Sequence, residues 1–142
     1  VKTSLLALPN MKDKNWGRII NVASISVKEP LNYLVLSNSL RSALVTWSKS
    51  LSVDVAKFNI TTNNILTGYF NTERLKQLNS KKAEKLGIKI SKIEETIKNT
   101  IPMKRLGNPE EYANLVCFLA SDKAGYITGV NIPIDGGYMK SL

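Results

Sequence analysis

Apolar side chains recur along most of the chain at the three- and four-residue steps of an amphipathic helix. A short apolar face predicts the end of a first helix over residues 1 to about 12, with Pro9 near its stop. The longest helical pattern covers residues 33–57. Its repeating apolar positions are Leu36, Leu40, Leu44, Trp47, Leu51 and Val55. We expect Trp47 to pack in the interior or at a subunit contact.

Between these helical patterns lie short runs of apolar and β-branched residues at 18–24, 60–66 and 129–134. The run that contains Ile19 and Ile20 is typical of a strand buried on both faces of a parallel sheet. Strands that alternate with helices predict the α/β class, with helices on both faces of the sheet. The chain therefore predicts one domain over residues 1–142, with three parallel strands and flanking helices.

The sequence Asn108-Pro109-Glu110-Glu111 predicts another helix start, because it combines a capping asparagine, a proline at the first position and a glutamate that reaches back. The buried face that follows comprises Tyr112, Leu115, Val116 and Leu119. Cys117 lies in the same helix, and we expect it to be inert and buried in the core. A turn at residues 135–137 should close the last strand.

Residues 66–107 form a lysine-rich excursion with ten basic and four acidic side chains, within a chain of net charge +9. Ser91 and Glu94 fit a capping box for the second of its two weak helical patterns. A basic block can attract an anion, but more often it only solvates a surface. Tyr69 and Phe70 are its aromatic residues, too few for stacking single-stranded nucleic acid. Binding of nucleic acid would rest on charge alone, so we expect none.

Composition removes several kinds of chemistry. The chain has no histidine, which excludes Ser-His-Asp and Cys-His nucleophile systems and histidine-ligated metals. Its single cysteine cannot close an intrachain disulfide or build a cysteine zinc cluster, so we expect no metal. No apolar run approaches the ~20 residues that span a bilayer, and no signal peptide opens the chain. These features favour a cytoplasmic protein with no membrane partner.

Five segments resemble the short-chain dehydrogenase/reductase family, and they occur in the family's order over essentially the whole chain. The first two match the family's fifth strand with its active-site serine and a later strand and loop. The other three match the entry to the last long helix and the C-terminal motifs. In this sequence they read G-R-I-I-N-V-A-S, I-T-T-N-N-I-L-T-G, I-P-M-K-R-L-G-N-P-E-E, F-L-A-S-D and Y-I-T-G with D-G-G.

The resemblance implies the C-terminal part of a Rossmann-type, doubly wound NAD(P)-binding domain. Its activity would be hydride transfer between NAD or NADP and a carbonyl or alcohol, most similar to 3-oxoacyl-carrier-protein reductases. The family's Gly-rich phosphate turn has no counterpart in residues 1–142, and we expect it to precede Val1. Without that half, we expect an isolated 1–142 chain to be poorly stable. The excursion over 66–107 corresponds to the family's substrate lid.

The catalytic window departs from the family's pattern. Ser24 matches the active-site serine, but Ser37 and Arg41 stand where the family has the Tyr-x-x-x-Lys pair. In the family, lysine lowers the pKa of the tyrosine, which exchanges a proton with the substrate oxygen. A serine hydroxyl is a weaker acid, and an arginine does not release a proton. Tyr33, one turn before Ser37, is a possible replacement for the missing phenol.

The resemblance also implies the cofactor contacts. Arg41 could still bind the nicotinamide ribose, backbone at Phe70 would meet the nicotinamide amide, and Thr72 would bind a phosphate. Gly68 would let the backbone approach the cofactor, although Thr67 replaces the family's proline before it.

Two readings of function therefore remain open. The first is an NAD(P)-dependent reductase that acts on a small carbonyl or alcohol, or an acyl thioester. The alternative is a catalytically impaired family member that binds a dinucleotide or a partner without turnover. Either would be a homo-oligomer formed through the long helix, as in the family.

Overall fold

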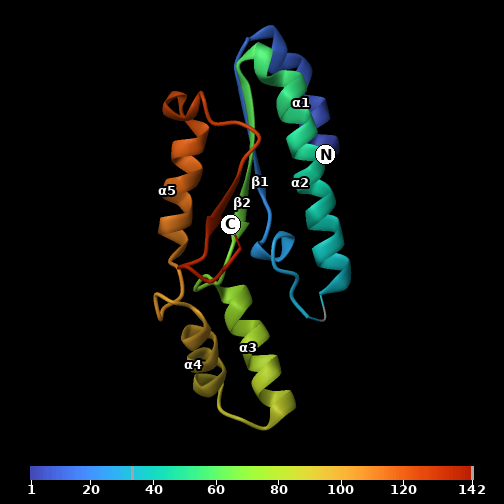
Figure 1. The fold of residues 1–142 in the computed structure, drawn as a ribbon. Helices are drawn as coiled ribbons and strands as arrows, with labels where there is room; N and C mark the ends of the chain where they lie inside the picture. Colours follow the sequence, from blue (N-terminus) through green and yellow to red (C-terminus); the bar gives the residue numbers. More distant parts are fainter. Residues whose placement is uncertain (33, 142) are drawn as a thin grey trace.

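The computed structural model describes residues 1–32 and 34–141, and it has an α/β fold (Figure 1). Its helices and strands follow the order that the apolar pattern predicts. They are α1 (Lys2–Asp13), β1 (Gly17–Val22), α2 (Val35–Val55), β2 (Ile60–Thr67), α3 (Glu73–Leu86), α4 (Ile90–Thr100), α5 (Pro109–Ala120) and β3 (Asn131–Ile134). No helix in these two ranges is long and apolar enough to cross a membrane.

The three strands form one parallel sheet in the order β1-β2-β3, which confirms the predicted architecture. Helices α1 and α2 cover one face of the sheet, and α5 covers the other (Figure 1). The carboxyl ends of the strands point toward α3 and α4, which project below the body in this view. The register places Asn21 opposite Asn64 and Asn64 opposite Asn131. Three polar side chains thus line up across the sheet.

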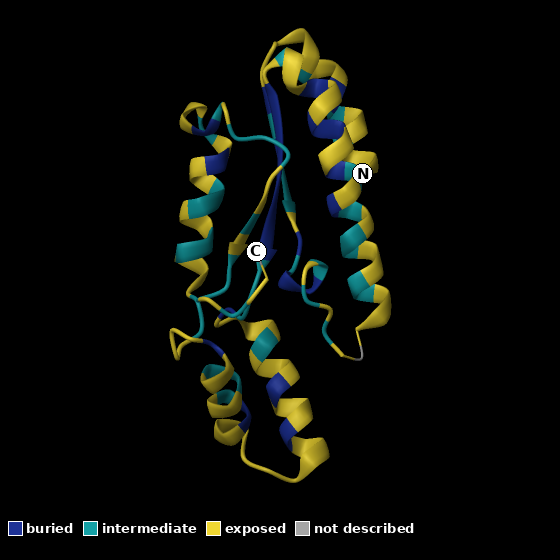
Figure 2. Cartoon of the chain, in the orientation of Figure 1, coloured by how far each residue is buried: buried dark blue, intermediate teal, exposed yellow. Residues whose placement is uncertain are grey.

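Burial is greatest at the central strand β2, where every residue from 60 to 66 is buried (Figure 2). On the α1–α2 side, Leu8, Ile19 and Leu51 form one core cluster, and Trp47 packs against it as expected. The prediction of burial on both faces is wrong for β1, since Val22 is 60% exposed. As an edge strand in this sheet, β1 has a neighbouring strand on one side alone.

The first helix was expected to end near Lys12 and ends at Asp13, with Pro9 inside it. Two local predictions were wrong. Helix α4 begins at Ile90 with Lys89 before it, so Ser91 lies within the first turn and does not cap the helix. Cys117 is exposed, because the buried side of α5 is the one that carries Leu119.

The predicted start of α5 is confirmed. Pro109 is its first residue, and the Glu111 carboxylate accepts a hydrogen bond from the Asn108 backbone N–H at 2.8 Å. Leu119 is fully buried with Ile65, and the side chains of Tyr112, Leu115 and Val116 pack around them. This packing fixes α5 against the sheet and sets the position of the loop that precedes it.

Candidate functional site

Three predicted site residues gather where β1 ends. Ser37 and Arg41 lie one turn apart near the start of α2, so their side chains share a face of the helix. Arg41 Nη1 donates hydrogen bonds to the backbone oxygens of Ala23 at 2.9 Å and Val22 at 3.2 Å. Arg41 Nε donates to Ser37 Oγ at 3.3 Å. The guanidinium therefore joins α2 to the backbone that leads directly into Ser24.

Ser24 lies just beyond the end of β1 and caps a short helical turn over Ile25–Val27. Its Oγ accepts a hydrogen bond from the Ser26 backbone N–H at 3.1 Å. The capping role that a loop serine commonly has is therefore present. Accepting this bond does not use the hydrogen of the Ser24 hydroxyl, for which no acceptor lies among the described residues.

The donors left in this cluster define what it can do. Ser24 and Ser37 each accept one hydrogen bond through Oγ. In residues 1–32 and 34–141 neither hydroxyl hydrogen has an acceptor, and such a hydrogen can be donated to a ligand oxygen. Within residues 1–32 and 34–141, Arg41 Nη2 donates to no protein atom. Two neutral donors and one permanent cation suit a carbonyl oxygen or a sugar hydroxyl. Tyr33, the other catalytic candidate, lies outside the described residues.

A shallow groove of about 510 Å³ runs along this part of the molecule. The polar cluster contributes Ser37 and Arg41 to its lining, and apolar side chains make up the remainder. These are Val22, Leu36, Leu40 and Leu44. The groove is therefore apolar along most of its length and polar where the hydroxyl and the guanidinium lie.

The predicted cofactor contacts follow β2. Phe70 is 9% exposed, and its ring packs edge-on against Tyr112 with centroids 5.4 Å apart. Phe70 and Gly107 form a parallel bridge in which the amide of Asn71 donates to the Gly107 oxygen. Among the described residues, no acceptor takes the Phe70 backbone N–H. That amide could donate to a carboxamide oxygen, as the resemblance implies.

Thr72 is the N-cap of α3, and its Oγ1 accepts from the Leu75 backbone N–H at 3.3 Å. The N-terminus of a helix favours an anion, and the Thr72 hydroxyl can still donate to one. Gly68 has a different explanation in the structure. A Cβ there would lie 2.7 Å from Asp135, so close packing against that residue already requires glycine.

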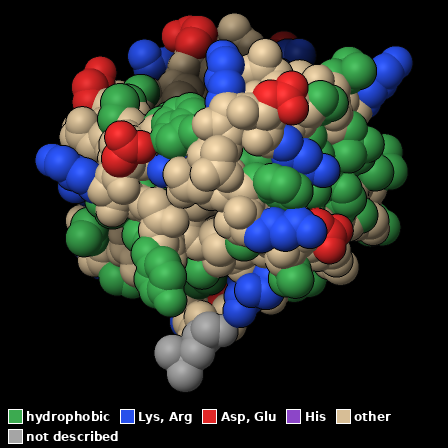
Figure 3. Space-filling model, turned by 90° about the horizontal axis from the view of Figure 1, so that it is seen from above, with side chains coloured by type: hydrophobic (Ala, Val, Ile, Leu, Met, Phe, Trp, Pro, Cys, Tyr) green, Lys and Arg blue, Asp and Glu red, His purple; other side chains and the backbone are tan. Residues whose placement is uncertain are grey.

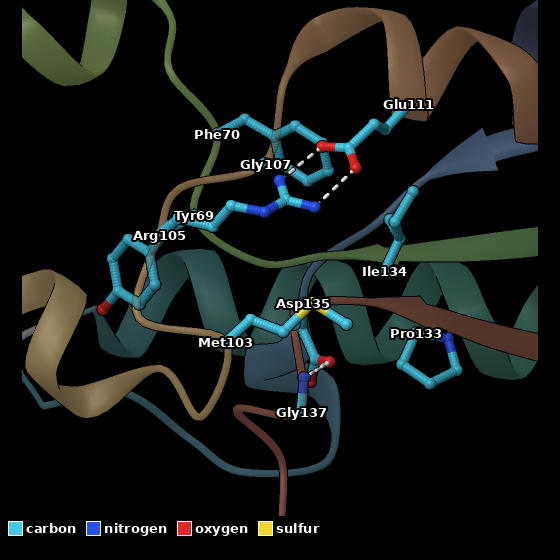
Figure 4. Close-up of a pocket in the computed structure, with 11 residues that line it drawn as sticks. Tyr69, Phe70, Met103, Arg105, Gly107, Glu111, Pro133, Ile134, Asp135 and Gly137 are labelled. Carbon is cyan, nitrogen blue, oxygen red and sulfur yellow. Dashed lines mark hydrogen bonds and ion pairs between the residues drawn. The ribbon is translucent and has the colours of Figure 1, made fainter.

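A second hollow, of about 310 Å³, lies between the end of β3 and the start of α5 (Figure 4). Phe70 and Gly107 line it, and the guanidinium of Arg105 faces the Glu111 carboxylate with both N–O distances at 2.7 Å. Hydrogen bonds from Arg105, and then from the Asn108 backbone, lower the pKa of Glu111 to about 2. This pair is satisfied within the protein and offers no proton to a reaction near neutral pH.

Tyr69 also lines the second hollow and is a phenol that sequence reasoning had not weighed as a catalytic group. Burial, followed by the charge of the neighbouring Tyr138, raises the pKa of the Tyr69 phenol. A raised pKa makes it a weaker proton donor, so it does not replace the missing tyrosine. Sequence reasoning also missed Asn38, whose Nδ2 donates to the Leu31 oxygen at 2.9 Å and holds the loop before α2.

Charge is distributed unevenly over the fold. Figure 3 views the molecule from above Figure 1, on the side away from α3 and α4, and Lys and Arg are scattered there among acidic and apolar groups. The basic excess belongs to residues 66–107, which include α3 and α4. No group of three or more Cys, Asp or Glu side chains that could hold a metal is found in the described ranges.

Comparison with known proteins gives consistent matches. The family model described as enoyl-(acyl carrier protein) reductase matches residues 1–139. The chain is 42% identical over 132 residues to the NADPH-dependent reductase BacG of Bacillus subtilis (strain 168), covering 93% of this chain and 51% of that protein. It is 37% identical over 132 residues to the 3-oxoacyl-[acyl-carrier-protein] reductase FabG of Buchnera aphidicola subsp. Schizaphis graminum (strain Sg), covering 90% and 48%.

Among solved structures, the chain is again similar to reductases. The NADPH-dependent reductase YwfH, involved in bacilysin biosynthesis, superposes with a TM-score of 0.86 at 42% identity, over 93% of this chain and 50% of that one. The L-sorbose reductase of Gluconobacter frateurii, solved with NADPH and L-sorbose, gives 0.87 at 33% identity, over 94% and 51%. The chain spans about half the length of the curated relatives it matches. From its family match, its relatives and its parallel sheet, the chain belongs to the short-chain dehydrogenase/reductase family.

Proposed function

We propose that this protein is an NADPH-dependent oxidoreductase that transfers hydride between the nicotinamide and a carbonyl or alcohol. Residues 1–142 contribute the substrate side of one Rossmann-type domain. The observation that carries the proposal is the hydrogen-bonded cluster at the end of β1, where Arg41 binds both Ser37 and the backbone that precedes Ser24. The words NADPH-dependent in the names of BacG and YwfH favour NADPH over NADH.

In this proposal the chain's own groups hold the reacting oxygen and the ribose. The hydroxyl of Ser24 donates to the substrate carbonyl oxygen, and Arg41 Nη2 donates to a ribose hydroxyl. The nicotinamide supplies the hydride when it is bound. As the carbonyl carbon gains hydride, its oxygen takes a proton from a water molecule held by Ser24 and Ser37, and bulk solvent supplies the proton that neutralises the hydroxide left behind. Arg41 keeps its proton throughout because a guanidinium does not ionise near neutral pH.

The backbone N–H of Phe70 and the α3 N-terminus at Thr72 would hold the cofactor at its carboxamide and a phosphate. In the part of the chain that the structure describes, both have backbone N–H groups with no protein acceptor, which is the ground for assigning them. Gly68 would contribute indirectly, by allowing Asp135 to pack closely below this loop.

We further propose that the substrate is a 3-oxoacyl thioester and that residues 66–107 form the lid over it. The names of two relatives, a 3-oxoacyl-[acyl-carrier-protein] reductase and an acetoacetyl-CoA reductase, support this class. The ten basic side chains of this segment would attract the phosphates of such a carrier. Raising the salt concentration should then increase KM for a thioester more than for a neutral ketone.

The exposed apolar side chains at the start of α2 support a homo-oligomer formed through this helix. Val35, Leu36 and Leu40 are 77%, 74% and 63% exposed. In a single copy of the chain these three apolar side chains face water, and their burial in an interface between copies would be favourable. Sedimentation of the complete protein at micromolar concentration should show a dimer or tetramer; a monomer alone would exclude this assembly.

One observation favours a second function, the binding of a dinucleotide or a partner without turnover. Within residues 1–32 and 34–141, Arg41 makes three hydrogen bonds, and Ser37 is one of its partners, so these groups already stabilise the fold. Neither supplies the phenol with a lowered pKa that the family's Tyr-x-x-x-Lys pair provides.

Oxidation of NADPH by the complete protein, measured with 3-oxoacyl thioesters and a panel of ketones, separates the two functions. We expect turnover, and we expect Ser24→Ala and Ser37→Ala each to lower kcat about 10-fold or more, since a positioned proton donor contributes about 100-fold or more. Ser39→Ala is the matched control, because Ser39 is exposed and donates to the Val35 oxygen within α2.

The outcomes are distinct. Loss of turnover in Tyr33→Phe alone would move the proton transfer to that phenol. Binding of NADPH without reduction of any carbonyl would establish the binding-only function.

A further inference from the structure

Residues 135–141 return from β3 across the carboxyl edge of the sheet. The Asp135 carboxylate shapes the turn, as Oδ1 accepts from the Gly137 amide at 2.9 Å and Oδ2 accepts from the Met139 amide at 2.8 Å. The Tyr138 ring then meets Tyr69 edge-on, with centroids 5.4 Å apart. Tyr138 and Met139 also pack on the buried cluster that comprises Ala23, Ile25, Val45 and Leu66. We call residues 138–141 the strap.

The strap ends on the loop that carries the candidate active-site serine. Glu29 lies in the loop that follows Ser24, and its Oε1 accepts hydrogen bonds from the backbone amides of Lys140 at 2.6 Å and Ser141 at 2.8 Å. These bonds connect positions 111 and 112 residues apart. The two backbone hydrogen bonds lower the pKa of the Glu29 carboxyl, so it is ionised and accepts strongly at neutral pH.

The neighbouring loop after β2 is fixed in another way. Phe70 pairs with Gly107 as a parallel bridge, and the Gly107 amide donates to the Tyr69 oxygen at 2.9 Å. The loop over residues 24–29, here called the Ser24 loop, forms no isolated β-bridge with a neighbouring segment among the described residues. Its backbone hydrogen bonds include short-range ones, such as those from the amides of Val27 and Glu29. The loop is already held at its start by the bond from Arg41 to the Ala23 oxygen and by the burial of Ile25. The Glu29 carboxylate, which holds two amides of a distant segment, adds a long-range restraint at its other end.

We propose that Glu29 is a positioning residue, which fastens the strap to the Ser24 loop and thereby holds the Ser24 hydroxyl in place for the reaction. This role rests on the proposed function, since it assumes that Ser24 meets the substrate. Loss of the carboxylate frees both amides of the strap and loosens the loop. The Phe70 loop stays in place because its pairing with Gly107 is independent of Glu29.

Hydrogen–deuterium exchange of the complete protein, read out by residue, tests the tether without any need for activity. In Glu29→Ala we expect the Lys140 and Ser141 amides to exchange about 10-fold faster or more, as a lost bond to a charged acceptor predicts. The amides of residues 25–29 should also exchange faster, and those of 70–72 should not change. Glu29→Gln keeps an oxygen acceptor and should restore most of the protection. Glu110→Ala, which removes an exposed carboxylate from α5, should match the wild type.

Kinetics with NADPH and the best carbonyl substrate then test the positioning. We expect Glu29→Ala to lower kcat about 10-fold, with KM for NADPH almost unchanged, because a misplaced hydroxyl weakens the reaction more than cofactor binding. Glu29→Gln should recover most of kcat. A general loss of folding would instead affect both variants and both constants.

Two results would overturn the proposal. One is faster exchange at the strap alone, with residues 25–29 as protected as in the wild type. The other is a wild-type kcat in Glu29→Ala despite a released strap. If the wild-type protein turns over no carbonyl, the proposed function fails, and the exchange data still decide whether Glu29 tethers the loop.

Discussion

The row of asparagines across the sheet gives a quantitative test of the packing described here. Asn64 in β2 is 1% exposed and joins both neighbouring strands through its side chain. Its Oδ1 accepts from Asn21 Nδ2 at 3.0 Å, and its Nδ2 donates to Asn131 Oδ1 at 2.8 Å. Replacement by alanine removes both bonds at once and leaves Asn21 with Ser48 Oγ as its remaining side-chain partner, at 3.2 Å.

The size of the effect follows from burial. Asn64→Ala leaves a half-buried amide N–H of Asn21 without its partner, at about 1–3 kcal/mol, and loses the bond to the exposed Asn131, at about 0.5–1.5 kcal/mol. We therefore expect a loss of about 2–4 kcal/mol in the free energy of unfolding. Asn131→Ala should lose about 1 kcal/mol, because water can enter at the exposed strand and satisfy Asn64 Nδ2.

Urea unfolding of the complete protein, followed by circular dichroism at one fixed protein concentration, measures both losses. The double variant adds a sharper criterion. Because Asn64 and Asn131 share a hydrogen bond, their replacements should not add, and the double variant should be little less stable than Asn64→Ala alone. Strict additivity, or an Asn131→Ala loss as large as that of Asn64→Ala, would refute the reasoning.

Two further predictions concern the second hollow. The Glu111 carboxyl has its pKa lowered from 4.5 to about 2 by Arg105 and the Asn108 amide, so its stabilising contribution is complete above pH 4.5 and is lost as the pH falls toward 2. Glu111→Gln should melt below the wild type at pH 7 and approach it near pH 2; a constant difference across this range would contradict the assignment. Gly107→Ala should lower the melting temperature, because the new Cβ would lie 2.7 Å from the Phe70 ring. A Gly107→Ala protein as stable as the wild type would show that the ring can move aside.

Features that depend on near neighbours could be predicted from the sequence. Asn108 and Glu111 are three residues apart, so their capping interaction forms with little help from the rest of the fold. The β-branched run over residues 60–66 predicted a strand, and β2 forms there. Its burial from residue 60 to residue 66 follows from its central place between β1 and β3. Ser37 and Arg41 could be placed together since four residues bring side chains onto one face of a helix.

The errors arose where a local signal competed with tertiary packing. Ser91 is of a residue type that caps helices, but α4 begins at Ile90 with Lys89 as its N-cap, so Ser91 already lies inside the helix. Cys117 lies among apolar residues in the sequence. The side of α5 that packs on the sheet is the one with Leu119, so Cys117 faces solvent.

What the tertiary structure alone decided is which distant groups meet. The sequence identified Ser24 and Arg41 as candidates, but the hydrogen bonds from Arg41 to the end of β1 depend on how α2 packs across the sheet. Gly68 is explained by the approach of Asp135, and Glu29 by the return of the strap. No periodicity or spacing encodes such pairs, because their partners are brought together by the burial of the core and not by the intervening sequence.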